Sequence, residues 1–263
     1  MSAAAAAVRT KAIQSLRRQL LASPRSQSIQ QIVPTCLTSL DNLLPNGGLP
    51  TGSIIEWISE DIGVSAVTIA LKAIAPMFTQ PGCLAIVDER HDFYPGATHN
   101  SGIPLSRILL IRPPRSTPPA SVNCHSHFVR QASAAHGDAL WALEQTARCS
   151  GVRVVLMFLA EASSTVMRRL QLAVERSGVT MVLIRPVSIL HQPSFADLRL
   201  HVTAVLPAST YSAGYRRLKV QLLRSRHGLQ HTGFAQLEVD HETSAVHSIS
   251  DLADSKPATT PAF

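Results

Sequence analysis

The stretch LWALEQTARCSGVRVVLMFLAEASSTVMRRLQLAVERSGVTMVLIRP, residues 140–186, carries the clearest fold signal in the chain. It contains two almost unbroken apolar runs, residues 152–159 and 180–185, on either side of an amphipathic segment at 164–177. Apolar runs without polar alternation are typical of strands that are covered on both faces. The segment between them has helical spacing and is followed by Gly178, a typical helix stop. The stretch therefore predicts an α/β fold.

The alternation of strand and helix extends toward the N-terminus. Asp138 is a good N-cap for a helix that runs to about residue 149, after a Pro- and Ser-rich loop at 112–128. Together these signals predict a mostly parallel sheet with helices on both faces. The upstream elements that we predict are a helix at 40–44, a turn at 45–52 (PNGGLPTG), a strand at 53–58, a helix at 64–75, and strands at 83–87 and 107–111.

The last part of the chain changes to a period of two. Residues 198–206 and 216–226 alternate apolar and polar side chains, which predicts an antiparallel pair added to the sheet, and residues 236–239 predict a final strand. We expect three regions in the chain. They are a basic amphipathic helix with a polar linker at 1–31, one α/β domain at 32–250, and a disordered tail at 251–263.

Composition excludes several classes of protein. The 263 residues are 45% apolar and 16% charged, which is too apolar for a disordered chain and enough for a core without disulfides or a structural metal. The four cysteines are far apart, which argues against a zinc ribbon, a redox dithiol or a secreted disulfide framework and favours a reducing, cytoplasmic compartment. No apolar run reaches 18 residues, so we expect no membrane span and no membrane partner. The net charge of +7 is compatible with nucleic acid, with an acidic partner, or with solubility alone.

The N-terminal segment has no acidic residue before Asp41 and has apolar side chains on one helical stripe. Leu16 and Leu20 would anchor this helix if it docks on a neighbouring protein, and the alternative is packing on the chain's own core. An Ala-, Arg- and Ser-rich start is also compatible with a mitochondrial transit peptide.

Several strings resemble parts of a RecA-type core. The run SLDNLLPNGGLPTGSIIEWISEDIGVSAVTIALK, residues 39–72, resembles its entry, with a turn that leads into a strand, a phosphate loop and a helix. CLAIVDERHDFYP, residues 83–95, resembles the second strand with its acidic end. Within RecA-like proteins, the strings WALEQ (141–145), AVERSG (173–178) and VQLLR (220–224) resemble the ImuA family, the small accessory proteins of bacterial translesion-synthesis cassettes. The resemblance spans about residues 35–239 and implies a RecA-like fold.

The same comparison implies that the ATPase site is degenerate. A working phosphate loop has the pattern G-x-x-x-x-G-K-[ST], in which the Lys neutralises the phosphates and the hydroxyl holds Mg²⁺. Here Ser59 replaces the first Gly, Val64 stands in place of the Lys, and Gly63 and Ser65 remain. Arg90 takes the place of the water-activating Glu, and Phe158 takes that of the Walker B Asp. We therefore predict no catalytic residue, no metal and no cofactor, with ATP and Mg²⁺ as the less favoured ligands.

A basic cluster in the predicted antiparallel pair is the candidate interaction surface. It could contact a partner protein or single-stranded DNA, and the alternative is a solvated strand face that its charge protects from aggregation. Its residues are Arg216, Arg217, Lys219, Arg224 and Arg226.

The resemblance to the ImuA family implies a non-catalytic role in error-prone translesion synthesis during the SOS response. The implied partners are an ImuB-type inactive Y-family-like polymerase and the error-prone polymerase α subunit, with RecA and single-stranded DNA as further candidates. Two alternatives remain at this point. One is a SulA-like inhibitor of cell division, and the other is a RecA-family DNA-dependent ATPase.

Overall fold

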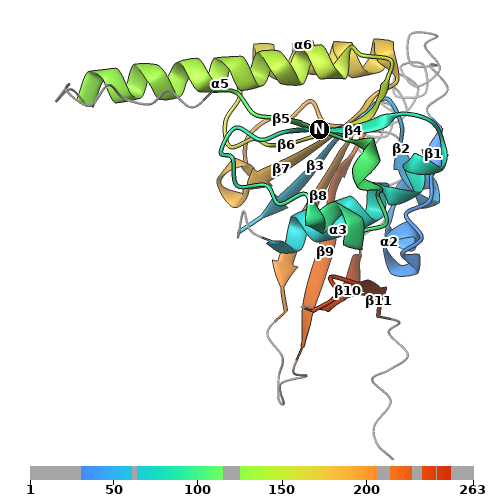
Figure 1. Ribbon diagram of the computed structural model, residues 1–263. Helices are drawn as coiled ribbons and strands as arrows, with labels where there is room; N and C mark the ends of the chain where they lie inside the picture. Colours follow the sequence, from blue (N-terminus) through green and yellow to red (C-terminus); the bar gives the residue numbers. More distant parts are fainter. Residues whose placement is uncertain are drawn as a thin grey trace, which may run out of the picture. The chain divides into compact units, whose positions relative to one another are not determined.

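A nine-stranded mixed sheet organises the part of the chain that the computed structural model describes, namely residues 31–60, 64–114, 125–205, 214–226, 233–240 and 242–249 (Figure 1). Side chains are described except those of residues 64–65 and 125–135. The chain divides into two units, Met1–Gln31 and Ile32–Phe263, and every described element belongs to the second. The predicted N-terminal helix with Leu16 and Leu20, and the predicted tail at 251–263, lie outside the described residues.

The sheet has the strand order β11-β10-β9-β8-β3-β7-β6-β4-β5. The six strands from β8 to β5 are mutually parallel, whereas β9, β10 and β11 are antiparallel to their neighbours. This confirms the predicted parallel sheet with an antiparallel addition at its C-terminal end. The strands are β3 (Ile54–Ser59), β4 (Cys83–Val87), β5 (Ile108–Ile111), β6 (Val152–Phe158), β7 (Thr180–Pro186), β8 (Leu198–Ala204), β9 (Tyr215–Ser225), β10 (Phe234–Asp240) and β11 (Val246–Ser248).

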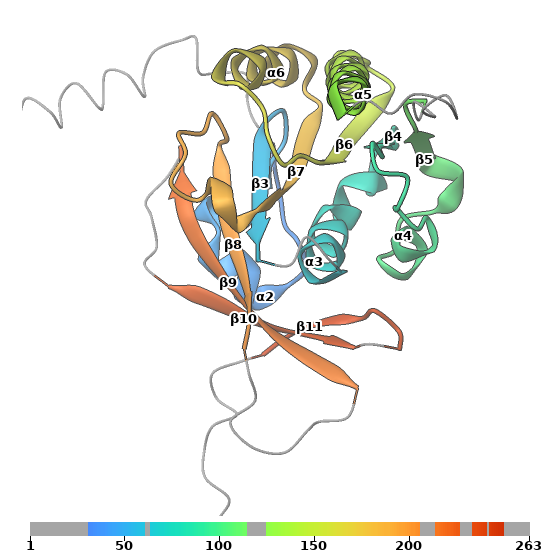
Figure 2. The same cartoon turned by 90° about the vertical axis from the view of Figure 1, so that its left-hand side faces the viewer.

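Helices cover both faces of the sheet, as predicted. Figures 1 and 2 show α5 and α6 on one face and α2 and α3 on the other. The described helices are α2 (Thr38–Leu43), α3 (Val64–Ile74), α4 (Gly96–Asn100), α5 (His125–Ala147) and α6 (Ser164–Ser177), with short 3₁₀ turns at Pro45–Gly47, Ala75–Thr79, Leu105–Arg107 and Val187–Ile189. Within the described residues, no helix is both long enough and apolar enough to cross a bilayer.

Two apolar clusters form the core, one on each face of the sheet. Successive residues of β3 show the alternation, because Ile54 packs under α5 and α6 whereas Ile55 and Trp57 pack under α2 and α3. The strands between these layers are apolar along almost their whole length because both of their faces are buried. The continuous apolar runs in the sequence therefore indicate strands that are covered by helices on both faces.

Helix α6 follows its predicted signals closely. The Ser163 hydroxyl accepts a hydrogen bond from the Val166 N–H, which caps the N-terminus of the helix. Gly178 ends the helix with a φ of 78°, and its N–H donates to the carbonyl of Val174 at 2.9 Å. A left-handed residue at this point reverses the chain directly into β7.

Helix α5 corrects one prediction. It begins at His125, so Asp138 lies inside the helix and is not its N-cap, and residues 125–128 are helical where a loop was predicted. The weak helix former Gly137 costs only about 1 kcal/mol relative to Ala, and an Ala-rich run that precedes it favours the helix. Local propensity at Gly137 and Asp138 therefore does not stop the helix.

Three short strands were not predicted. They are β11 and the two-stranded ribbon β1 (Ile32–Val33) and β2 (Leu49–Pro50), which pair antiparallel. Strands of two or three residues are too short to show a period, so only their pairing partners reveal them.

Candidate functional site

A pocket of about 290 Å³ lies where strands β6 and β7 end and the chain leaves β4. Ligands of open α/β sheets bind at this carboxyl edge, so it is the first place to look for a site. The residues that line the pocket are Glu89, Arg90, His136, Phe158, Leu159, Ala160, Glu161, Ile184 and Pro186.

The described phosphate-loop positions lie at the carboxyl end of β3 and at the beginning of α3. Ser59 is the last residue of β3 and is buried. Val64 and Ser65 begin α3, their side chains are not described, and Gly63 lies outside the described residues. The structure thus has the predicted strand before residues 61–63 and the predicted helix after them.

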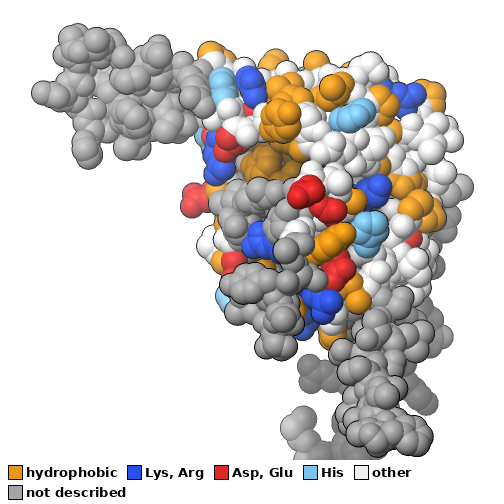
Figure 3. Space-filling model, turned by 60° about the horizontal axis from the view of Figure 1, so that its bottom comes forward, with side chains coloured by type: hydrophobic (Ala, Val, Ile, Leu, Met, Phe, Trp, Pro, Cys, Tyr) orange, Lys and Arg blue, Asp and Glu red, His pale blue; other side chains and the backbone are white. Residues whose placement is uncertain are grey.

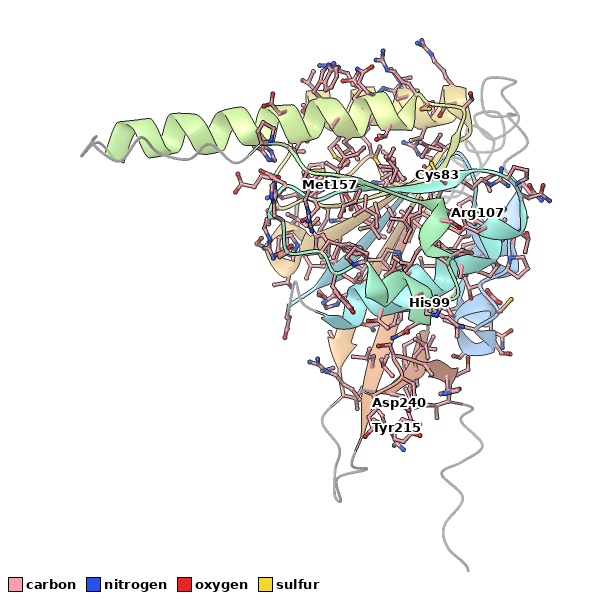
Figure 4. All side chains as sticks on the ribbon, viewed as in Figure 1. Cys83, His99, Arg107, Met157, Tyr215 and Asp240 are labelled. Atoms are coloured by element: carbon pink, nitrogen blue, oxygen red, sulfur yellow. The ribbon has the colours of Figure 1, made fainter. Side chains whose placement is uncertain are left out.

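The position that we predict to correspond to Walker B carries no oxygen ligand. Phe158 ends β6, lines the pocket and packs against the core on the α2–α3 side. The preceding residue, Met157, faces the opposite way and lies beneath α5 (Figure 4). Mg²⁺ prefers oxygen ligands, so a benzyl side chain at this position cannot hold the metal that nucleotide hydrolysis needs.

Acidic side chains beside the pocket have hydrogen-bond partners within the same chain. The buried carboxylate of Asp88 accepts from Arg112 Nε at 2.9 Å, and it also accepts from the backbone N–H of Asp92 and Phe93. Glu89 contacts His136 Nδ1 at 3.1 Å, and Asp92 pairs with Arg90 Nη2 at 2.6 Å. These partners stabilise the loop after β4, which is an internal structural role. Glu161 is exposed at the rim of the pocket.

A buried charge cluster supports one wall of the pocket. Glu56, in the middle of β3, is fully buried between two guanidinium groups, with Arg185 Nη1 and Arg199 Nε each at 2.8 Å from a carboxylate oxygen. Arg185 also donates from Nε to the carbonyl of Leu159 at 3.2 Å, and thereby ties the end of β6 to β7. Arg199 donates to carbonyls in the loop after β7, including that of Ile189 at 3.0 Å.

We did not predict this charge cluster from the sequence, although the sequence contains a signal for it. Glu56 interrupts the apolar run SIIEWI, and Arg185 closes the apolar run TMVLIR. A charged residue inside a strand that is buried on both faces needs a partner, because an unpaired buried charge is very unfavourable. Which residues pair follows only from the strand order, since β3 lies between β7 and β8.

The predicted basic cluster on β9 is spread over the strand. Arg217 Nε pairs with Glu238 at 2.7 Å, and Lys219 Nζ lies 4.4 Å from the ring centroid of Phe234. Arg216 is on the opposite face of the strand, because side chains alternate. Asp240, the partner of Tyr215 in the ladder, marks this end of the strand in Figure 4.

The other two members of the cluster lie toward the far end of β9. Arg224 donates to the carbonyl of Ser194 at 2.6 Å, and Arg226 contacts Asp197 at 3.4 Å and Glu175 at 3.6 Å. The five residues therefore do not form one patch. On the face that Figure 3 shows, cationic and acidic side chains are interspersed.

His201 on β8 is a further titratable group on this sheet. Its Nε2 is buried without a hydrogen-bond partner, and burial lowers the pKa of the imidazole, an effect that the charge of Glu60 partly opposes. Within the described residues, no three His, Cys, Asp or Glu side chains are placed to ligate a metal ion.

Comparisons with known proteins agree with this geometry. A family described as the RecA N-terminal domain matches residues 18–189, about two thirds of the chain. Protein RecA from Streptomyces ambofaciens is 32% identical over 89 residues, which cover 34% of this chain and 24% of that protein. Protein RecA from Listeria monocytogenes is 36% identical over 75 residues, covering 28% and 21%. Protein RecA from Heliobacterium modesticaldum is 28% identical over 93 residues, covering 35% and 27%. The chain thus spans about a quarter of the length of these curated relatives.

Proposed function

Because the chain belongs to the RecA N-terminal domain family, we propose that it is a non-catalytic RecA-like accessory protein of error-prone translesion DNA synthesis, acting in the DNA-damage (SOS) response through protein binding. The observation that carries the non-catalytic part is the side chain at the end of β6. Phe158 stands at the Walker B position, lines the pocket and packs on the core.

Two further features support the loss of ATP hydrolysis. Val64 stands where a phosphate-loop Lys would neutralise the phosphates. Arg90 stands where a carboxylate would activate water, and its guanidinium pairs with Asp92. Catalysis of phosphoryl transfer depends almost wholly on positioned charge, so replacement of three charged positions removes most of the rate enhancement.

The assignment to translesion synthesis rests on resemblance to the ImuA family. The strings that support it lie on three separate elements, namely WALEQ on α5, AVERSG at the end of α6 and VQLLR on β9. The partners that we propose are an ImuB-type inactive Y-family-like polymerase and the error-prone polymerase α subunit, with RecA and single-stranded DNA as further candidates.

Phosphate release from ATP and Mg²⁺, with and without single-stranded DNA, tests the non-catalytic assignment. We expect no turnover above that of a RecA protein whose phosphate-loop Lys is replaced, measured in parallel with active RecA. Turnover that disappears in a Gly63→Ala/Ser65→Ala variant would contradict the assignment and favour a DNA-dependent ATPase.

The frequency of UV-induced mutation in a deletion strain tests the cellular role. We expect the deletion to abolish induced mutation, and both the wild-type gene and the Gly63→Ala/Ser65→Ala gene to restore it. Unchanged induced mutation in the deletion strain would reject the role in translesion synthesis. Filamentation on overexpression would then favour an inhibitor of cell division.

A further inference from the structure

The outer surface of α5 and α6 carries a second pocket, on the side of these helices that faces away from the sheet. The pocket has a volume of about 300 Å³ and is lined by Arg148, Arg169, Leu172, Ala173, Arg176 and Ser177. Figure 4 shows a group of nitrogen-tipped side chains that project outward from these two helices. The two helices are held together beneath it, where the Ser177 hydroxyl donates to the carbonyl of Ala147 at 2.6 Å.

Charge at this pocket is unbalanced. Arg148 and Arg169 both contact the buried carboxylate of Glu144, one on each oxygen. Within the described residues, Arg176 has no ion-pair partner. Three guanidinium groups thus line the pocket, and one carboxylate contacts two of them. Each guanidinium has five N–H donors, most of which remain available to an external acceptor.

Neighbouring acidic residues do not cancel this charge. Glu175 is next to Arg176 in sequence, but its carboxylate accepts from Gln171 at 2.7 Å and lies 3.6 Å from Arg226. Asp138 is almost three helical turns before Arg148 along α5. The pocket therefore favours an anionic ligand.

An exposed tryptophan lies on the same face. Trp141 is two helical turns before Arg148 on α5, and 64% of its surface is exposed to solvent. A large aromatic side chain held at the surface is typical of an anchor in a protein interface. Leu172 is half-buried in the pocket and adds an apolar contact surface between the arginines.

We propose that the α5–α6 surface, formed by Trp141, Arg148, Arg169, Leu172 and Arg176, binds an acidic peptide segment that carries a large apolar side chain. The apolar side chain would contact Leu172 and Trp141, and the flanking carboxylates would pair with the arginines, as Glu144 does within the chain. Single-stranded DNA fits less well, because it needs an extended groove with several stacking aromatics. Trp141 is the one large exposed aromatic among the described residues of α5 and α6.

Intrinsic fluorescence tests this proposal directly, because the chain has two tryptophans and Trp57 is fully buried in the core. The probe is a short synthetic peptide of Asp and Glu residues with one central Phe. We expect binding to shift the emission of Trp141, to weaken with added salt, and to weaken further when Ala replaces the Phe. Trp141→Phe should abolish the emission change.

A pair of arginine variants on one helix provides the matched comparison. Arg176→Glu should weaken binding of the peptide about tenfold or more, since it removes one charge-assisted contact and adds a repulsion. Arg168→Glu makes the same charge change on α6, but Arg168 bonds Gln171 and does not line the pocket, so binding should stay unchanged. Arg176→Ala provides a milder second variant, and circular dichroism checks that each variant is folded.

Three results would overturn the proposal. They are no binding of the peptide to the wild-type chain, an equal loss in the Arg168 and Arg176 variants, and tighter binding of an oligothymidine that Arg176→Glu abolishes. The last would make single-stranded DNA the ligand of this surface. The assay needs neither ATP nor a mutagenesis phenotype, so this proposal and the role in translesion synthesis can fail separately.

Discussion

Replacing Glu56 by Gln leaves two guanidinium groups buried without a counter-charge. At the observed 2.8 Å, and with an effective dielectric constant near 20, each ion pair contributes roughly 6 kcal/mol of Coulomb energy before desolvation is subtracted. Removing one partner of a buried pair costs about 3–5 kcal/mol in practice. We expect the upper end of this range for Glu56→Gln, because one carboxylate serves both Arg185 and Arg199, and the amide has a single acceptor oxygen. Such a loss is a large fraction of the total stability of a typical domain.

Urea unfolding followed by the fluorescence of Trp57, in a Trp141→Phe background, measures this loss as a difference in unfolding free energy. Glu238→Gln is the matched control, because it breaks an ion pair with Arg217 that is largely exposed, and we expect it to cost less than about 1 kcal/mol. The reasoning is refuted if the unfolding free energy of Glu56→Gln lies within about 1 kcal/mol of that of its parent.

Three further expectations concern single residues. Gly48→Ala should lower the unfolding free energy by about 1–3 kcal/mol in the same urea assay, because the new Cβ would lie 2.5 Å from the backbone oxygen of Val33. Burial lowers the pKa of His201 below its ordinary 6.5, so the unfolded chain binds this proton more readily. Relative to His201→Gln, the wild type should therefore lose unfolding free energy as the pH falls below that value. If the difference in unfolding free energy between the two proteins is the same at about pH 8 and pH 5, this expectation is wrong. Burial also raises the pKa of the Cys83 thiol, so peptide mapping should find slower alkylation of Cys83 than of the exposed Cys36.

Most of the secondary structure was predictable because the strands of this sheet are buried on both faces. The runs VRVVLMF and TMVLIRP are almost entirely apolar, with Arg153 and Arg185 as their charged members, and both are strands with almost the predicted bounds. The start of α5 was not predictable, because Gly137 and Asp138 resemble a helix boundary and the helix continues through them. The strands β1, β2 and β11 have only two or three residues each, so their pairing and not their local pattern reveals them.

The candidate sites were likewise predictable from the sequence only in part. The identity of Phe158 was available from the sequence, and its place at the end of β6 agrees with the strand that we predicted. That the ATPase site is degenerate stays a prediction. The basic cluster on β9 was a poor guide to a surface, because Arg217 and Arg226 have acidic partners on other segments. Conversely, Trp141 and Arg176 lie on different helices, and nothing in the sequence links them.

The amino-acid order alone was enough to predict an α/β chain with RecA-like strings, and it also led us to predict a degenerate ATPase site. This follows because hydrophobic periodicity and residue identity are local properties, each readable within one segment. Strand order placed Glu56 between Arg185 and Arg199, and the packing of α6 beside α5 brought Arg169 to the carboxylate that Arg148 also contacts. Contacts of this kind join residues from separate segments, so their partners and burial depend on the packed fold and not on local sequence.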